Sequence, residues 1–306
     1  MSKQKCFSFI TFFVLAATLG ALLSGCALRS PKAPASAGEF RLVTSFYPIY
    51  IATINITKDV PGVVVENLTQ AQTGCLHDYQ LKPQDLITID SADVFVTNGA
   101  GMEAFLGKVI DQRPALKVID ASAGIKLLKD QNGIENPHVW VSVTNAITQV
   151  RNIAEQLASQ NPANAQKFAS NAAIYEKKLL NLKDEMDIAM KAYKGREIIT
   201  FHEAFPYFAQ EFGLKIAAVI EREPGVAPTP QQLEQIILTV RATGIKALFA
   251  ELQYSAKAAD VIALETGATV YNLDPIVTGQ TSTASADEYI IKMRQNLQTL
   301  EKALGN

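Results

Sequence analysis

Residues 163–193 read ANAQKFASNAAIYEKKLLNLKDEMDIAMKAY and decide the fold. This stretch is rich in Ala, Leu, Lys, Glu and Met, which favour helices, and its apolar residues recur near helical spacing. These residues are Phe168, Ile174, Leu179 or Leu180, Leu182, Met186 and Met190. About thirty helical residues would span roughly 45 Å. Asn161-Pro162 marks a break before the stretch, and no turn residue interrupts it, so we predict one long rigid helix rather than a helical hairpin.

On either side of this helix, short apolar runs alternate with helical stretches. The predicted strands are Arg41–Phe46, Gly62–Leu68, Asp93–Thr97 and Leu116–Ile119, then Glu197–Phe201, Lys215–Ile220, Ala247–Ala250 and Thr269–Leu273. The clearest helices between them are Pro83–Ser91, Gln231–Thr243 and Ser255–Thr266. Such alternation predicts an α/β fold with two lobes, each a parallel sheet flanked by helices. We assign 39–160 to the N-terminal lobe, 161–194 to the linking helix and 195–306 to the C-terminal lobe.

The N-terminus indicates where the protein works. Lys3 and Lys5 precede an apolar stretch from Phe7 to Leu23, which is followed by Ser24, Gly25 and Cys26. This layout is typical of a secretory signal with a small-residue cleavage site, so we assign 1–25 to a signal peptide. Leu-Ser-Gly-Cys resembles the bacterial lipobox, which implies a lipid on Cys26. Residues 26–38, rich in Ala, Ser and Pro, are then a flexible tether. We expect an extracytoplasmic protein held at the membrane only by its lipid.

The composition limits the partners. Twenty-eight basic and 30 acidic residues give a weakly acidic chain without a basic run, which argues against nucleic acid. Of the three cysteines, Cys6 lies in the signal and Cys26 would carry lipid, so Cys75 has no cysteine with which to form an intramolecular disulfide. For Cys75 we favour the role of a small buried hydrophobe over that of a zinc ligand.

The chain has only three histidines, and all three occupy segments typical of binding loops. His77 follows the second strand, His138 lies in Asn136-Pro137-His138-Val139-Trp140, and His202 follows the strand Glu197–Phe201. Neutral imidazole is a preferred ligand of zinc. Each histidine by itself would more often be an ordinary surface or hydrogen-bonded residue. Together they suggest one metal site.

Two carboxylate residues, like His202, directly follow predicted strands. Asp274 follows the strand Thr269–Leu273, and Glu251 follows Ala247–Ala250. Ligands of open α/β sheets bind outside the carboxyl ends of the strands. Two histidines of one half would thus face one histidine and Asp274 of the other half, and three nitrogen donors with one oxygen suit zinc. We predict that Glu251 lies behind the ligands and orients an imidazole.

Several motifs occur together in one order. They are the lipobox, HDYQLKPQD at 77–85, NPHVW at 136–140, FHEAFPY at 201–207 and Asp274-Pro275. This combination resembles the metal-binding solute-binding proteins of ABC transporters, the ZnuA/TroA-like family (solute-binding protein family 9). The resemblance covers essentially all of the mature chain. It implies two α/β lobes joined by one long helix, with the metal in the cleft between the lobes.

By motif position, the resemblance carries the family's metal ligands over to His77, His138, His202 and Asp274. A histidine at the third position is more common in zinc binders, whereas manganese binders tend to have glutamate there. His202 at this position therefore favours Zn²⁺. Mn²⁺ remains the alternative, because residues 124–136 lack the histidine-rich acidic loop of many zinc-specific members. The implied partner is an ABC transporter membrane permease, and we expect a monomer.

Two other classes of function compete with transport. Three histidines and a carboxylate can also hold the metal of a zinc hydrolase, but catalytic sites keep one position open for water. His202-Glu203 also lacks the second histidine of His-Glu-x-x-His, so we expect no enzyme. A surface adhesin is the other alternative, and no repeat supports it. Trp140, the only tryptophan, is expected to pack in the core.

Overall fold

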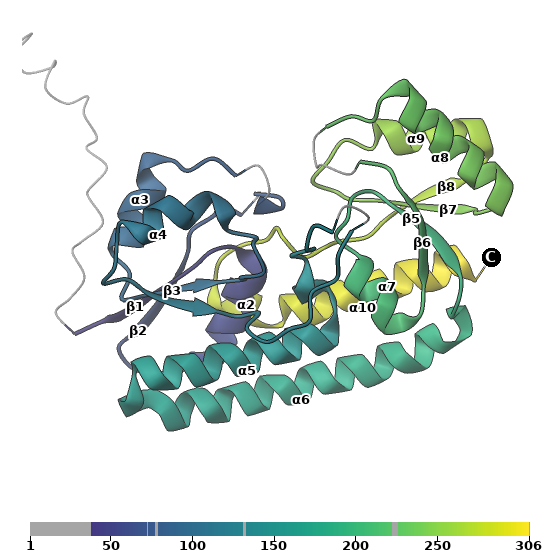
Figure 1. Cartoon of the computed structure of the whole chain (residues 1–306). Helices are drawn as coiled ribbons and strands as arrows, with labels where there is room; N and C mark the ends of the chain where they lie inside the picture. Colours follow the sequence, from purple (N-terminus) through teal and green to yellow (C-terminus); the bar gives the residue numbers. More distant parts are fainter. Residues whose placement is uncertain (1–37, 72, 77–78, 131–132, 222–225, 306) are drawn as a thin grey trace, which may run out of the picture. The chain divides into compact units, whose positions relative to one another are not determined.

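The computed structural model describes residues 38–71, 73–76, 79–130, 133–221 and 226–305. It is an α/β structure with two four-stranded parallel sheets, which confirms the predicted fold class (Figure 1). Residues from Phe40 onward belong to one compact unit. The predicted signal peptide, the lipid-attachment residue Cys26 and almost all of the predicted tether lie outside the described residues. Among the described residues, no helix is long and apolar enough to span a membrane.

The first sheet has the strand order β2-β1-β3-β4. Its strands are β1 (Phe40–Thr44), β2 (Val63–Asn67), β3 (Val94–Thr97) and β4 (Lys117–Asp120). Parallel neighbours need crossover connections, and helices supply them. These helices are α2 (Tyr47–Ile56), α3 (Pro83–Asp90) and the short α4 (Gly107–Asp111).

The second sheet repeats this arrangement with the order β6-β5-β7-β8. Its strands are β5 (Glu197–Thr200), β6 (Lys215–Val219), β7 (Ala247–Ala250) and β8 (Thr269–Asn272). The crossovers are α7 (Pro206–Phe212), α8 (Pro230–Thr243) and α9 (Lys257–Thr266), and α10 (Glu288–Leu304) ends the fold. All eight strands predicted from apolar runs are present. The central strands β3 and β7 are buried at every position, as expected for parallel strands covered on both faces.

The long helix α6 spans Ala165–Met190, 26 residues, and lies within the predicted linking segment. A single 3₁₀ turn, Pro162–Asn164, separates it from α5 (Val143–Gln160). Its buried apolar residues form one continuous stripe: Phe168, Ala172, Tyr175, Leu179, Leu182, Met186 and Met190. Ile174, which the sequence pattern groups with these residues, is 61% exposed, because its position in the 3.6-residue period lies off this stripe.

Helix α6 connects the two halves of the chain through packing. It contacts α2 and α5, which belong to the first half, and α7 and α10, which belong to the second. Figure 1 shows α5 and α10 running beside it. One large apolar cluster accordingly contains residues from both halves, while a smaller cluster accompanies each sheet. Burial of this shared core, rather than helix propensity, is what stabilises so long a helix.

Candidate metal centre

His138 is held by a short local turn. It follows Pro137 and precedes α5, with only 2% of its surface exposed. Its ring Nδ1–H and its backbone N–H both donate to Asn136 Oδ1, each at 2.9 Å. The Asn136 amide is oriented in turn because its Nδ2 donates to the backbone oxygen of Glu203 at 2.7 Å. With the proton on Nδ1, the lone pair of Nε2 is directed to the other side of the ring.

His202 is held by a partner from the neighbouring strand. It lies just beyond the end of β5, and Glu251 lies just beyond the end of β7, which pairs with β5. The His202 Nδ1–H donates to Glu251 Oε1 at 2.5 Å, and Gln253 Nε2 donates to the second carboxylate oxygen at 2.8 Å. Both side chains of the pair are almost completely buried. Glu251 therefore has the geometry of a residue that orients a ligand imidazole.

The two imidazoles meet a thiol. The Nε2 atoms of His138 and His202 lie 3.3 Å apart, and the Cys75 Sγ lies 3.4 Å from each of them. One donor atom from each of the three residues lies within 4.8 Å of the others, and all three residues are buried. Cys75 is thus a buried residue as expected, but its sulfur faces two nitrogens that can bind a metal.

Burial and charge act in opposite directions on the protons of this cluster. Burial lowers the pKa of His202, yet the nearby Glu251 and Cys75 outweigh it and raise that pKa above its ordinary value. Burial raises the pKa of the Cys75 thiol, against the opposing charge of His202. A metal must displace protons from imidazole and thiol, so the cluster couples metal binding to proton release.

Asp274 is engaged elsewhere in this structure. Its Oδ2 forms an ion pair with Lys292 of α10, and its Oδ1 accepts from the backbone N–H of Ile276 at 2.7 Å. Asn296, also of α10, bonds both the backbone N–H and the carbonyl of Asp274. His77 lies outside the described residues. The structure therefore brings together His138, His202 and Glu251 of the predicted set. The ligand roles of His77, His138, His202 and Asp274 stay predictions.

Sequence reasoning did not assign three residues that support the site. Asn136 orients His138, and an asparagine two residues before a histidine is a local signal for such a turn. The Tyr254 hydroxyl oxygen accepts a hydrogen bond from the backbone N–H of Cys75 at 3.3 Å. The Tyr254 ring packs edge-on to the His202 ring, with 5.6 Å between the ring centroids. Lys292 pairs with Asp274 across 18 residues. Neither Tyr254 nor Lys292 has a sequence signal, because both contacts depend on tertiary packing.

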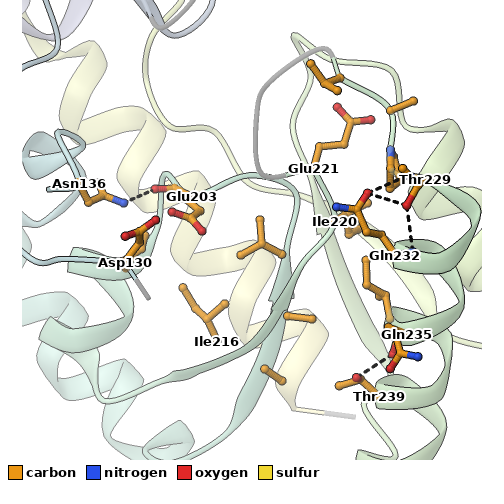
Figure 2. A pocket seen from close by; sticks show the side chains of 18 of the residues that line it. Asp130, Asn136, Glu203, Ile216, Ile220, Glu221, Thr229, Gln232, Gln235 and Thr239 are labelled. Atoms are coloured by element: carbon orange, nitrogen blue, oxygen red, sulfur yellow. Dashed lines mark hydrogen bonds between the residues drawn. The ribbon is translucent and has the colours of Figure 1, made fainter. Parts of the chain in front are cut away.

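A cavity adjoins this cluster rather than containing it. It has a volume of about 990 Å³ and is lined by β6, the start of α8 and residues 128–130 and 136. Figure 2 shows Asn136 bonded to Glu203 on one wall, with Thr229 and Gln232 on the wall formed by α8. Asn136 is shared, because its amide both lines the cavity and orients His138. The cavity wall thus lies one side chain from the His138 imidazole.

Comparison with known proteins decides the family. The profile of the family described as zinc-uptake complex component A, periplasmic, matches residues 42–303. The chain belongs to this family. It is a metal-binding solute-binding protein of ABC transporters, of solute-binding protein family 9, as the sequence motifs predicted. The relatives described below are metal-binding transport proteins and not enzymes, which argues against the zinc-hydrolase alternative.

The relatives within the zinc-uptake component A family differ in the metal they bind. The chain is 30% identical to the high-affinity zinc uptake system protein ZnuA of Bacillus subtilis, over 95% of this chain and 96% of the relative. It is 28% identical to the iron-binding protein YfeA of Yersinia pestis, over 93% and 92%. A solved structure of FpvC from Pseudomonas aeruginosa in complex with Mn²⁺ has a TM-score of 0.78 at 32% identity, and the match covers 87% of this chain and 98% of that one. These relatives support Zn²⁺ as the cargo, with Mn²⁺ as the alternative.

Proposed function

We propose that this chain is a lipid-anchored receptor that captures a divalent transition metal, with zinc favoured over manganese, outside the cytoplasmic membrane. It delivers the metal to the permease of an ABC importer and acts as a monomer. His138 and His202 form the core of the ligand set, with His77 and Asp274 as the further ligands and Glu251 as the group that orients His202. The metal is cargo, so the site must both bind it and release it.

One observation carries this proposal. Two buried imidazoles come from segments 64 residues apart, and their Nε2 atoms lie 3.3 Å from one another. Each ring is held through Nδ1 by an oxygen acceptor, so both present the same nitrogen. Bringing two imidazole nitrogens together in the protein interior is costly unless a shared proton or a metal satisfies them. Hydrogen-bonded Nδ1 atoms are also the usual support of metal-ligating histidines.

A metal titration tests the proposal. The full chain, purified in detergent without added metal, is first analysed for its metal content and then titrated with Zn²⁺ and with Mn²⁺ in competition with a chelator of known affinity. We expect a single tight site, tighter for zinc than for manganese, because imidazole suits zinc better. Absence of a saturable site for either metal would refute the proposal.

Metal affinity should rise with pH. Protons on His138 and His202 compete with the metal, and the raised pKa of His202 extends this competition above the range of an ordinary histidine. Apparent zinc affinity should therefore increase continuously between about pH 5 and about pH 9, rather than level off just above the ordinary histidine pKa of roughly 6.5. Competitive titration in a series of buffers measures it. An affinity independent of pH would count against imidazole ligands.

Replacing Cys26 by serine should release the protein from membranes. The lipid would be attached through the cysteine sulfur, and the hydroxyl of serine does not replace it. Fractionation of cells that express the wild type or Cys26→Ser, followed by detection of the protein in membrane and soluble fractions, measures the effect. Cys6→Ser is the matched control and should leave the distribution unchanged. A Cys26→Ser protein that stays with the membranes would show that the anchor assignment is wrong.

A further inference from the structure

The sulfur of Cys75 occupies a position that the predicted ligand set leaves out. It lies 3.4 Å from the Nε2 atoms of both His138 and His202, and those two atoms lie 3.3 Å apart. The three atoms thus form a nearly equilateral triangle inside the protein. For tetrahedral zinc with ordinary bond lengths, adjacent ligand atoms lie about 3.3 Å apart for two nitrogens and about 3.6 Å apart for nitrogen and sulfur. The triangle therefore has nearly the dimensions of one face of a zinc coordination tetrahedron.

Each corner of this triangle is held in place by its own support. Asn136 fixes the His138 ring and Glu251 fixes the His202 ring. The backbone of Cys75 is held by the Tyr254 hydroxyl at 3.3 Å. The preceding glycine permits this approach, because a Cβ at Gly74 would lie 3.0 Å from the same hydroxyl oxygen. The thiol is thus positioned by contacts of its own.

The predicted oxygen ligand has a different set of contacts. The two carboxylate oxygens of Asp274 are engaged by Lys292 and by the backbone of Ile276. Among the described residues, the metal-ligating atoms that gather around one point are two nitrogens and one sulfur. Thiolate with imidazole is a donor set that suits zinc, whereas manganese prefers oxygen ligands.

We propose that Cys75 is a metal ligand that binds as a thiolate beside His138 and His202, and that its sulfur makes the receptor selective for zinc over manganese. This inference rests on the proposed function, because it concerns the same metal. On binding, the S–H bond of Cys75 is replaced by a metal–sulfur bond, the proton passes to solvent, and no redox change occurs.

Cobalt(II) is the probe that distinguishes a sulfur ligand. The full chain in detergent is loaded with Co²⁺, and its near-ultraviolet spectrum is recorded for the wild type, Cys75→Ser, Cys75→Ala and Asp274→Asn. We expect a sulfur-to-cobalt charge-transfer band in the wild type, its loss in both Cys75 variants and its retention in Asp274→Asn. Cys26→Ser, which removes the other cysteine expected in the mature chain, is the matched control and should keep the band.

Competitive titration of the same variants gives the selectivity. Cys75→Ser should reduce the ratio of zinc to manganese affinity by about tenfold or more, equivalent to about 1.4 kcal/mol. Alkylation of the wild type gives a further readout without any substitution. Bound zinc should slow the alkylation of Cys75, which mass spectrometry of the peptide that contains Cys75 measures. Circular dichroism establishes that the variants are folded.

The outcomes separate the two proposals. A wild type that binds Co²⁺ and Zn²⁺ at one site without a charge-transfer band, or whose Cys75 is alkylated equally fast with zinc, overturns the role of Cys75 and leaves the receptor function intact. A wild type that binds none of these metals overturns both. If a folded Cys75→Ser protein loses the band but keeps the wild-type ratio of zinc to manganese affinity, the assignment of Cys75 as a ligand is supported and its role in selectivity is overturned.

Discussion

Replacing His202 by alanine should lower zinc affinity by more than roughly 100-fold, the upper end of what loss of an outer-shell partner costs a metal site. The substitution removes one of the two imidazole nitrogens that lie 3.3 Å apart. It also leaves the buried carboxylate of Glu251 without the N–H that it accepts at 2.5 Å. Competitive zinc titration of the purified variant measures the loss. A folded His202→Ala protein with wild-type affinity would contradict the assignment of His202 as a ligand.

Two further variants separate ligand loss from loss of orientation. Glu251→Gln keeps the shape of the side chain and an oxygen acceptor but removes the charge beside His202, so we expect a smaller effect of about 10- to 100-fold. Glu265→Gln changes an exposed carboxylate on α9 that forms an ion pair with Arg241, and it should leave zinc affinity unchanged. If Glu251→Gln binds zinc as the wild type does, orientation by Glu251 is not needed for binding.

Replacing Trp140 by alanine should reduce the free energy of unfolding by about 3–5 kcal/mol, the usual cost of truncating a buried large aromatic side chain. Trp140 is 1% exposed, packs edge-on to Phe46 with 4.9 Å between centroids and donates its indole N–H to the Pro275 oxygen at 2.7 Å. This bond ties the segment that holds His138 to the segment that holds Asp274. Urea denaturation followed by circular dichroism measures the loss, since the variant has no tryptophan to report by fluorescence.

Trp140→Phe divides this effect into its parts. Phenylalanine restores most of the apolar contact but cannot donate to the Pro275 oxygen, so the remaining loss should be about 1–3 kcal/mol, the cost of an unsatisfied buried acceptor. Leu264→Ala is the control, because Leu264 is 86% exposed on α9 and its truncation should change stability little. Equal stability of Trp140→Ala and the wild type would show that this contact does not hold the two segments together.

Local patterns were sufficient for the strands and for the long helix. All eight strands lie where continuous apolar runs predicted them, because parallel strands are covered on both faces and show this as a run rather than an alternation. The long helix was predictable from helix formers without a turn residue, yet its buried face was not fully so. Ile174 fits a loose helical spacing, but only packing against α2, α5, α7 and α10 selects which stripe is buried.

The candidate site, like the secondary structure, was predictable from the sequence only in part. Strand ends and the motif order led us to expect His138, His202 and Glu251 near one another, and these side chains do lie together. Side chains at the carboxyl ends of neighbouring parallel strands and in the loops beside them converge. The contact between Cys75 and His202 spans 127 residues, and the ion pair of Asp274 with Lys292 joins a loop to a helix. No short-range pattern encodes such pairs.

By itself, then, the sequence determined the α/β class, the positions of the strands and the family, since these depend on local periodicity and on motifs that are contiguous in the chain. Only the tertiary structure decided that the Cys75 thiol lies 3.4 Å from the Nε2 atoms of both buried imidazoles and that Asp274 faces Lys292. Those contacts depend on how segments far apart in the chain pack around the shared core, and packing is a property of the whole fold.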